Sequence, residues 1–295
     1  MCRLYGLRAN EPTKIECTLV RAQNALMEQS RKDSEGLTHG HGWGVASHPD
    51  GVPFVEKQTW AAYHGEHFKK TAARIYSKSV IAHVRRATVG PPGIENTHPF
   101  VHGLWLFAHN GTIPNFEQVR ERLLDAMDPL QRNEIHGSTD SEHVFRYLMS
   151  LWEHHPERPL IETLRLGLEN IIAWCREIDP NKTIGLNVIW TDGEQMVGSR
   201  LNRTLWYLER DGIVPCEICG SASICTTCSG AKHRTSSTTS RPSPTSTEPS
   251  RLHSRASRES RPWFRDSATP FWKTGTGGAR CCEWPSQTSI GYPAS

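Results

Sequence analysis

The second residue of the chain combines the groups that an amide-cleaving nucleophile needs. Once Met1 is removed, Cys2 carries a thiol and a free α-amine on one residue. The amine has an ordinary pKa of about 7.7–8.0 and the thiol one of about 8.5, so the amine can accept the thiol proton during attack on a carbonyl. Such a nucleophile needs no His partner. A Met-Cys start also fits an ordinary protein, and the segments downstream must decide between the two interpretations.

Three downstream segments carry residues that suit amide cleavage. Residues 80–88 read as a strand that runs into a loop, and the guanidinium of Arg85 at its end could clamp a carboxylate. Residues 104–111 read as a strand ending in an Asn-Gly turn, where the Asn110 amide and the Gly111 N–H could both face one oxyanion. Residues 138–142 open a helix, and Asp140 could pair with an ammonium or simply cap that helix. Each segment taken alone also has a purely structural interpretation.

In this order, and behind a Met-Cys start, the segments resemble the class II glutamine amidotransferases, N-terminal-nucleophile hydrolases that release ammonia from glutamine. The resemblance runs from Cys2 to about Gly220. Residues 2–12, 41–46 and 96–100 resemble its stand-alone subgroup, which includes the bacterial YafJ-type proteins and the amidohydrolase of ergothioneine synthesis. That subgroup carries no synthase or isomerase domain.

The resemblance implies a role for each matching position. Cys2 would be the nucleophile. Asn110 and Gly111 would form the oxyanion hole. Arg85, with Thr88 beside it, would hold the α-carboxylate of glutamine or of a γ-glutamyl group, and Asp140 its α-amine. The chain departs from the pattern at Val89, where many glutamine-dependent relatives have a His. This departure weakens the case for free glutamine and leaves the thiolate chemistry unaffected.

Charge and composition restrict the partners. The net charge is +3, but residues 221–295 contain 10 Lys and Arg against 4 Asp and Glu, which leaves residues 1–220 at about −3. We therefore expect no nucleic-acid partner. The chain has no apolar run long enough for a membrane span and no secretory start, so we expect a cytoplasmic protein without a membrane partner, with Cys2, Cys17 and Cys175 as free thiols.

Hydrophobic periodicity predicts alternating helices and strands between residues 1 and 220. Apolar residues recur at helical spacing in 15–26, 116–127, 144–151 and 160–175. Strands are predicted at 4–7, 44–47, 80–85, 104–109, 184–191, 195–200 and 204–209, with a hairpin turn at Asp192-Gly193. This pattern fits an α+β protein with two sheets flanked by helices. The resemblance implies the four-layer αββα sandwich of the N-terminal-nucleophile hydrolases over residues 1–220.

The composition changes after Gly220. Residues 221–295 contain 27 Ser and Thr, no Val, one Leu and two Ile. So little aliphatic surface predicts a disordered tail. The mixture of Ser, Thr, Arg and Pro is also what translation in a wrong reading frame would produce, a hypothesis about the gene that nucleotide sequencing would test.

Two Cys-x-x-Cys pairs lie across this change in composition, Cys216/Cys219 and Cys225/Cys228. Paired units of this kind often bind zinc, but the five residues between them are fewer than in the usual ribbon. Zinc, free thiols and coincidence all remain open. His83, His98 and His109 are expected to form hydrogen bonds near the site. We assign no metal and no cofactor.

The expected function is a cysteine-dependent amidohydrolase that cleaves the γ-amide of glutamine, or of a γ-glutamyl compound, through a thioester. It could supply ammonia to a partner synthase or hydrolyse a γ-glutamyl conjugate alone. The absence of an acceptor domain and Val89 favour the second. The alternative is a non-catalytic scaffold or degenerate family member that acts through its basic tail.

Overall fold

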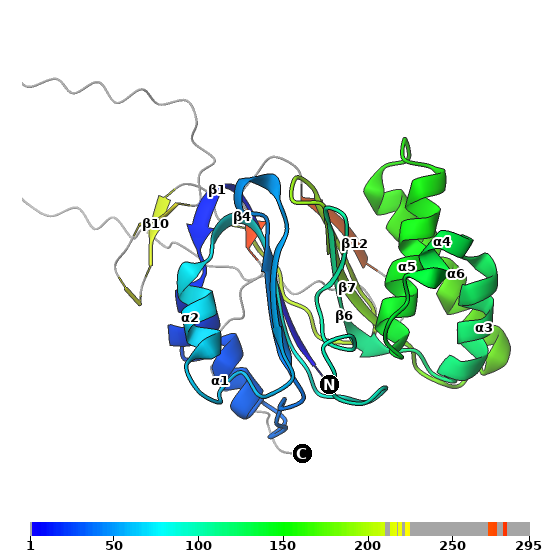
Figure 1. The fold of residues 1–295 in the computed structure, drawn as a ribbon, viewed down its shortest axis with the longest axis horizontal. Coiled ribbons are helices and arrows are strands. Elements are labelled where there is room, and N and C mark those ends of the chain that lie inside the picture. Colours follow the sequence, from blue (N-terminus) through cyan, green and yellow to red (C-terminus); the bar gives the residue numbers. More distant parts are fainter. Residues whose placement is uncertain are drawn as a thin grey trace, which may run out of the picture.

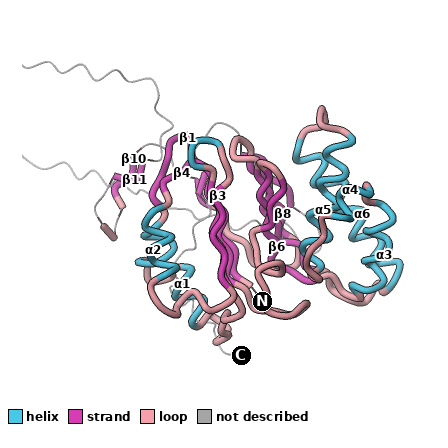
Figure 2. The backbone as a smooth tube through the Cα atoms, in the orientation of Figure 1, coloured by secondary structure: helices cyan, strands magenta, loops and turns pink. Residues whose placement is uncertain are grey.

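Two antiparallel β-sheets face each other in the computed structural model, and helices cover both outer sides (Figure 1). The structure describes residues 2–209, 213–216, 218–219, 222–224, 271–275 and 280–281. The layers run helix, sheet, sheet, helix, which is also clear from the tube view (Figure 2). The predicted αββα sandwich is confirmed.

The first sheet begins with the strand that carries the N-terminus. Its order is β3-β2-β4-β1-β13-β9, and its strands are β1 (Arg3–Lys14), β2 (Trp43–Ser47), β3 (Phe54–Gln58), β4 (Tyr76–Val84), β9 (Leu208–Glu209) and β13 (Arg280–Cys281). β1 pairs with β4 so that Arg3 lies opposite Val84. β2 pairs with the other edge of β4 and places Trp43 opposite the same Val84. The start of β1 and the end of β4 therefore meet.

The second sheet has the order β12-β8-β7-β6-β5. Its strands are β5 (Phe100–His102), β6 (Trp105–Thr112), β7 (Gly185–Thr191), β8 (Met196–Arg200) and β12 (Phe271–Gly275). The predicted hairpin joins β7 to β8, and Gly193 in its turn has φ +96°, a conformation that favours glycine. A separate hairpin consists of β10 (Ile213–Pro215) and β11 (Ala222–Ile224).

Helices cover the outer face of each sheet. On the first sheet lie the short π-helix η1 (Cys17–Arg21), α1 (Leu26–Arg31) and α2 (His67–Arg74). Phe68 of α2 packs edge-on against the fully buried Trp43 of β2, with 5.0 Å between ring centroids. A short 3-10 turn, η2 (Pro49–Gly51), follows β2.

On the second sheet lie α3 (Phe116–Ala126), α4 (Pro129–Asn133), α5 (Asp140–His154) and α6 (Leu160–Ile178). Phe145 of α5 stacks on Phe107 of β6 at 5.2 Å. Both rings are fully buried in the largest apolar cluster.

A small apolar layer joins the two sheets. Its buried members are Leu4, Ala46, Ile81, Leu106, Ala108 and Ile189. Neighbouring residues along each strand face the helices instead, because side chains alternate between the two faces of a sheet. Truncation of such a buried leucine to Ala costs about 2–5 kcal/mol of unfolding free energy.

Polar contacts also join the sheets at the ends of the strands away from Cys2. Arg8 of β1 donates from Nε to the Glu194 carbonyl in the β7–β8 turn at 2.9 Å. Ser79 of β4 and Thr191 of β7 pair through their hydroxyls at 3.2 Å. The His48 Nε2, just after β2, lies 2.7 Å from the Leu104 carbonyl.

Some predicted elements differ in the structure. The helix predicted over residues 15–26 is divided, because the chain leaves η1 at Ala22 in extended conformation and restarts as α1. Of the strand predicted over residues 204–209, only Leu208–Glu209 forms β9. The three short strands β11, β12 and β13 lie within the predicted tail, and most of residues 221–295, with the pair Cys225/Cys228, lie outside the described residues. The division into a domain over 1–220 and a tail over 221–295 stays a prediction.

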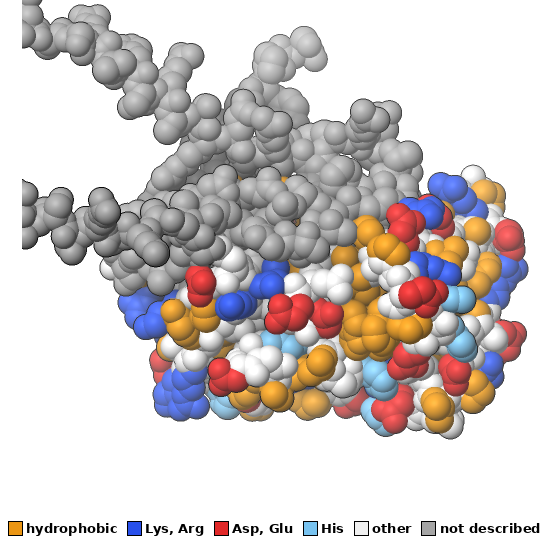
Figure 3. Space-filling model, turned by 90° about the horizontal axis from the view of Figure 1, so that it is seen from above, with side chains coloured by type: hydrophobic (Ala, Val, Ile, Leu, Met, Phe, Trp, Pro, Cys, Tyr) orange, Lys and Arg blue, Asp and Glu red, His pale blue; other side chains and the backbone are white. Residues whose placement is uncertain are grey.

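The surface of the described part mixes both signs of charge. On the face seen in Figure 3, Lys and Arg side chains alternate with Asp and Glu around apolar areas. Among the described helices, none combines the length and apolar character that crossing a bilayer requires.

Candidate active site

Strand alternation directs Cys2, Arg85 and Asn110 to the same end of the space between the sheets. Leu4 faces the second sheet, and Cys2 precedes it by two residues. Ile81 does the same on β4, with Arg85 four residues later. On β6, Ala108 faces the first sheet and Asn110 follows by two. Because side chains alternate with a period of two, each site residue extends an inward-facing row.

The Cys2 thiol is half-buried and held by the backbone of the β4 strand end. The Arg86 N–H donates to Sγ at 3.3 Å, and Sγ lies 3.5 Å from the Arg86 carbonyl. Burial raises the pKa of the Cys2 thiol, while the Arg86 N–H and the positive charge of Arg85 act in the opposite direction. The Asp140 carboxylate also raises that pKa. Both ionic groups are therefore near enough to Sγ to affect its charge.

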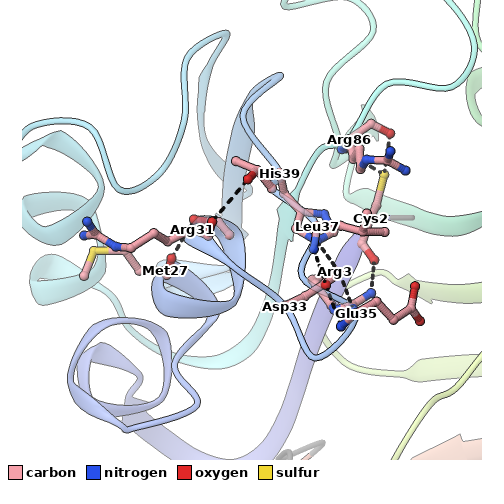
Figure 4. Close-up of polar contacts among 11 residues, drawn as sticks. Cys2, Arg3, Met27, Arg31, Asp33, Glu35, Leu37, His39 and Arg86 are labelled. Atoms are coloured by element: carbon pink, nitrogen blue, oxygen red, sulfur yellow. Dashed lines mark hydrogen bonds and ion pairs between the residues drawn. The ribbon is translucent and has the colours of Figure 1, made fainter.

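A buried ion pair holds the backbone of Cys2 from the other side (Figure 4). Arg3 donates to the Cys2 carbonyl at 3.2 Å and to Asp33 Oδ2 at 2.6 Å. His39 Nε2 lies 2.9 Å from the same carboxylate oxygen. Burial lowers the pKa of His39 to about 4, so near neutrality His39 is an uncharged donor to Asp33. The backbone N–H groups of Glu35 and Leu37 donate to Asp33 Oδ1.

The Arg85 guanidinium is buried and fixed by the loop that follows β4. Its Nη1 donates to the Pro91 carbonyl at 3.1 Å, and its Nη2 donates to those of Val89 at 2.9 Å and Gly90 at 3.1 Å. Burial lowers the pKa of Arg85, which stays charged at neutral pH. Nε–H and the second Nη1–H make no hydrogen bond within the described part of the chain, so these donors are available to a carboxylate.

The Asn110 side chain is buried at the end of β6, opposite Asn187 of β7. Its Oδ1 has no hydrogen-bond partner among the described residues. Gly111 follows, and a Cβ there would collide with the Gly185 carbonyl and the His109 ring. The sequence therefore requires glycine at position 111 for close packing of β6 on β7, whatever else its N–H does.

The Asp140 carboxylate starts α5 and also anchors the chain after β6. Oδ2 accepts from the Ile113 N–H at 2.9 Å, and Oδ1 accepts from the Ser141 N–H at 2.8 Å. Thr139, and not Asp140, caps the helix, since its hydroxyl oxygen accepts from the Glu142 N–H. His109 Nδ1 lies 2.9 Å from the Ser141 hydroxyl. These contacts hold Asp140 close to the end of β6.

Thr88 differs from the other predicted residues because its side chain is exposed on the loop after β4. Within residues 2–209 its hydroxyl makes no hydrogen bond to another predicted site residue.

Asn96 is a residue that the roles assigned from sequence did not include. It is buried, donates to the Pro91 carbonyl at 3.1 Å and accepts from the Ser138 N–H at 2.8 Å. It thus connects the loop that holds Arg85 to the segment before Asp140, and its place in the segment 96–100 was the available signal.

The three histidines near the site differ in how they are held. His109 Nε2 lies 2.9 Å from the Gly185 carbonyl, as the predicted hydrogen-bonding role requires. His83 and His98 instead pack against each other at 4.2 Å between ring centroids, and their ring nitrogens have no partner among the described residues. The hydrogen-bonding role predicted for these two stays a prediction. Burial keeps both uncharged by lowering the pKa of His83 to about 3 and that of His98 well below its ordinary value.

Comparison with known proteins gives relatives for most of the chain. It is 29% identical over 227 residues to a probable glutamine amidotransferase, DUG3, of Saccharomyces cerevisiae, which covers 68% of this chain and 63% of the relative. It is 33% identical over 220 residues to an uncharacterized protein of Methanocaldococcus jannaschii, and this match covers 71% of this chain and 54% of the relative. A γ-glutamyl-hercynylcysteine sulfoxide hydrolase of Mycobacterium tuberculosis is 25% identical over 219 residues, and this match covers 72% of this chain and 83% of the relative. The matches thus span 54% to 63% of the length of the first two relatives.

Among solved structures, a predicted glutamine amidotransferase from Pseudomonas aeruginosa PA01 superposes with a TM-score of 0.44 and 24% identity, over 74% of this chain and 81% of the other. The family model for class II glutamine amidotransferases matches residues 1–214. Since this match covers most of the chain, the protein belongs to the class II glutamine amidotransferases.

Proposed function

We propose that the chain is a cysteine-dependent amidohydrolase acting on the γ-amide of a γ-glutamyl compound. After removal of Met1, the α-amine of Cys2 takes the thiol proton while Sγ forms a bond to the γ-carbonyl carbon. The tetrahedral oxyanion is stabilised by the Asn110 side-chain N–H and the Gly111 N–H. The C–N bond then breaks, the amine leaves with the proton, and water cleaves the thioester and restores the thiol. No metal or cofactor takes part in these steps.

One observation carries this proposal: opposite charges act on the same thiol. Arg85 lowers and Asp140 raises the pKa of Cys2, although the three residues come from β1, the end of β4 and the start of α5. A γ-glutamyl head group has a carboxylate and an ammonium on one carbon. A cation and an anion that both act on the nucleophile suit such a zwitterion, with Arg85 for the carboxylate and Asp140 for the ammonium. Thr88 is a candidate for a further contact once substrate covers the loop.

The names of the relatives support both versions of this chemistry. One is called a probable glutamine amidotransferase and another a γ-glutamyl-hercynylcysteine sulfoxide hydrolase. We favour hydrolysis of a γ-glutamyl conjugate over ammonia supply to a synthase, because Val89 stands where many glutamine-dependent relatives have a His. The catalytic residues proposed lie within the segment 1–220.

The test is labelling of the purified chain with a glutamine-like diazoketone, followed by intact-mass and peptide analysis. We expect one adduct, on Cys2, in protein that lacks Met1, and none in Cys2→Ala. Turnover of a γ-glutamyl anilide by the isolated chain would support the hydrolase version. Ammonia release that requires an added synthase would support the other. Turnover by protein that retains Met1 would exclude the mechanism.

A further inference from the structure

Three cysteine thiols from two segments far apart in the sequence meet beside the first sheet, away from Cys2. The Sγ atoms of Cys17, Cys216 and Cys219 all lie within 4.8 Å of one another. Cys17 and Cys216 are half-buried and Cys219 is exposed. All three are thiols, and none takes part in a disulfide.

The local structure explains how the thiols converge. Cys17 begins η1, directly after the long strand β1. Cys216 and Cys219 lie in the connection of the β10–β11 hairpin, and β11 packs beside β1, as Figure 1 also shows. A Cys-x-x-Cys spacing within a hairpin turn lets two thiolates face one ion, which is the usual half-site of structural zinc proteins. Cys17 supplies the third thiol from another element.

Three thiols this close together offer a soft ligand set that suits a zinc-class cation. A second negative sulfur a few ångströms away opposes ionisation of the first, as with any pair of like charges. A bound divalent cation reverses this effect and deprotonates coordinating thiols. Arg21 is the nearby cation, and it is already paired with Glu16 at 2.6 Å.

We propose that Cys17, Cys216 and Cys219 bind a zinc-class divalent ion that fastens the β10–β11 hairpin to the junction of β1 and η1. Thiolates at about 2.3 Å from a tetrahedral zinc lie about 3.8 Å from one another, which the observed arrangement reaches with small side-chain shifts. Three thiolates around zinc are typical of structural Cys₃ sites with one further ligand. Cys225 and Cys228 lie outside the described residues and are no part of this proposal.

The ion serves stability and not chemistry, because Cys17 follows the far end of β1 from Cys2. A hairpin as short as β10–β11 is marginal alone, and metal binding supplies folding free energy to elements of this kind. Loss of the metal should therefore loosen the hairpin while turnover per folded molecule stays the same.

Metal analysis of the full chain tests the proposal. We expect about one zinc per chain in the wild type and in Cys175→Ala, and little in Cys17→Ser, Cys216→Ser and Cys219→Ser. Cys175 is a matched control, since it is a buried cysteine of α6 and is not part of the thiol cluster found among the described residues. Cys17→His should retain metal, because imidazole also ligates zinc, and this variant separates loss of a ligand from loss of the fold.

Replacement of the ion with Co²⁺ gives a second readout. Sulfur-to-cobalt charge-transfer absorption is expected in the wild type, with lower intensity in Cys17→His. Zinc retained in Cys17→Ser, or cobalt binding without this absorption, would overturn the proposal. So would intact-mass evidence that two of the three sulfurs are joined in a disulfide in freshly purified protein kept under reducing conditions.

Discussion

At the scale of single residues, the Cys2 thiol depends on the charge of Arg85. Arg85→Gln removes a cation that lowers the pKa of Cys2, so this pKa should rise further. We expect slower alkylation of Cys2 by iodoacetamide at a given pH, a pH profile displaced upward, and kcat/KM lower by about 10- to 100-fold through loss of a charged hydrogen bond to substrate. The measurement is the alkylation rate as a function of pH.

Arg86→Gln is the matched control, since it makes the same charge change one residue further on. The contact of Arg86 with Cys2 uses backbone atoms only. Equal displacement of the pH profile by both substitutions would show that the effect is one of net charge and not of the position of Arg85.

The Asn110 amide is the second residue whose loss should be specific. Asn110→Ala removes one donor to the oxyanion, and kcat should fall by about 10²- to 10³-fold with a much smaller change in KM. Asn133→Ala, at the exposed end of α4, is the control and should leave both parameters unchanged. A rise in KM alone would instead assign Asn110 to ground-state binding.

The residue types could be predicted from the sequence better than their contacts. The order of Cys2, Arg85, Asn110 and Asp140 along the chain was sufficient to indicate amide chemistry. For the connection made by Asn96 the only signal was its place in the segment 96–100, because a buried amide that joins two loops has no periodicity of its own. The exposure of Thr88 also depends on how the loop after β4 folds.

At the scale of elements, the segment between α1 and β2 holds the first residues of β1. Asp33→Asn leaves Arg3 as a buried cation without its anion and should lower the free energy of unfolding by about 3 kcal/mol. We also expect lower kcat, because Arg3 fixes the Cys2 carbonyl. Chemical denaturation together with kcat measurement tests this.

Glu35→Gln is the control. It removes the same charge from an exposed position of that segment, two residues after Asp33. It should change the free energy of unfolding by no more than about 0.5 kcal/mol and leave kcat unchanged. A destabilisation equal to that of Asp33→Asn would contradict a specific role for the Arg3–Asp33 pair.

Long periodic elements could be predicted, and among the short strands β2 and β8 were predicted while β3 and β5 were not. The apolar repeats of residues 116–127 and 160–175 correspond to α3 and α6. The repeat over residues 15–26 was misleading, since the three-turn pattern hides an extended break at Ala22. β3 and β5 are short and have weak alternation, and the partners that pair with them decide their conformation.

At the scale of the whole molecule, buried histidines make stability depend on pH. The folded pKa is about 4 for His39 and about 3 for His83, against about 6.5 in an unfolded chain. Below pH 6.5 the unfolded state therefore binds protons that the folded state does not. The free energy of unfolding is fully present above this value and should decrease by about 1.4 kcal/mol per pH unit for each such group as the pH falls.

Urea denaturation at a series of pH values between 7 and 5 measures this slope. His83→Leu should make it shallower, while His64→Gln, at an exposed position, should leave it unchanged. Equal stability at both ends of the series would contradict the burial of uncharged imidazoles.

The fold as a whole followed from alternation and family resemblance together. Alternation indicated sheets with one apolar face toward helices, and the resemblance implied that two such sheets stack. Neither could indicate that Cys17 would meet Cys216 and Cys219, because contacts between residues this far apart depend on how β1 and the hairpin pack.

The polar contacts that Arg8, Ser79 and His48 make between the sheets hold one end of the sandwich together. They join the layers at the ends of the strands remote from the nucleophile, and the apolar layer between is small. Widening of the gap to admit a bulky leaving group can thus occur at the thiol end by a slight tilt of one sheet, with those distant contacts acting as the pivot. The range of leaving-group amines that the site accepts would then depend on Arg8, Ser79 and His48, although these residues do not contact the amine.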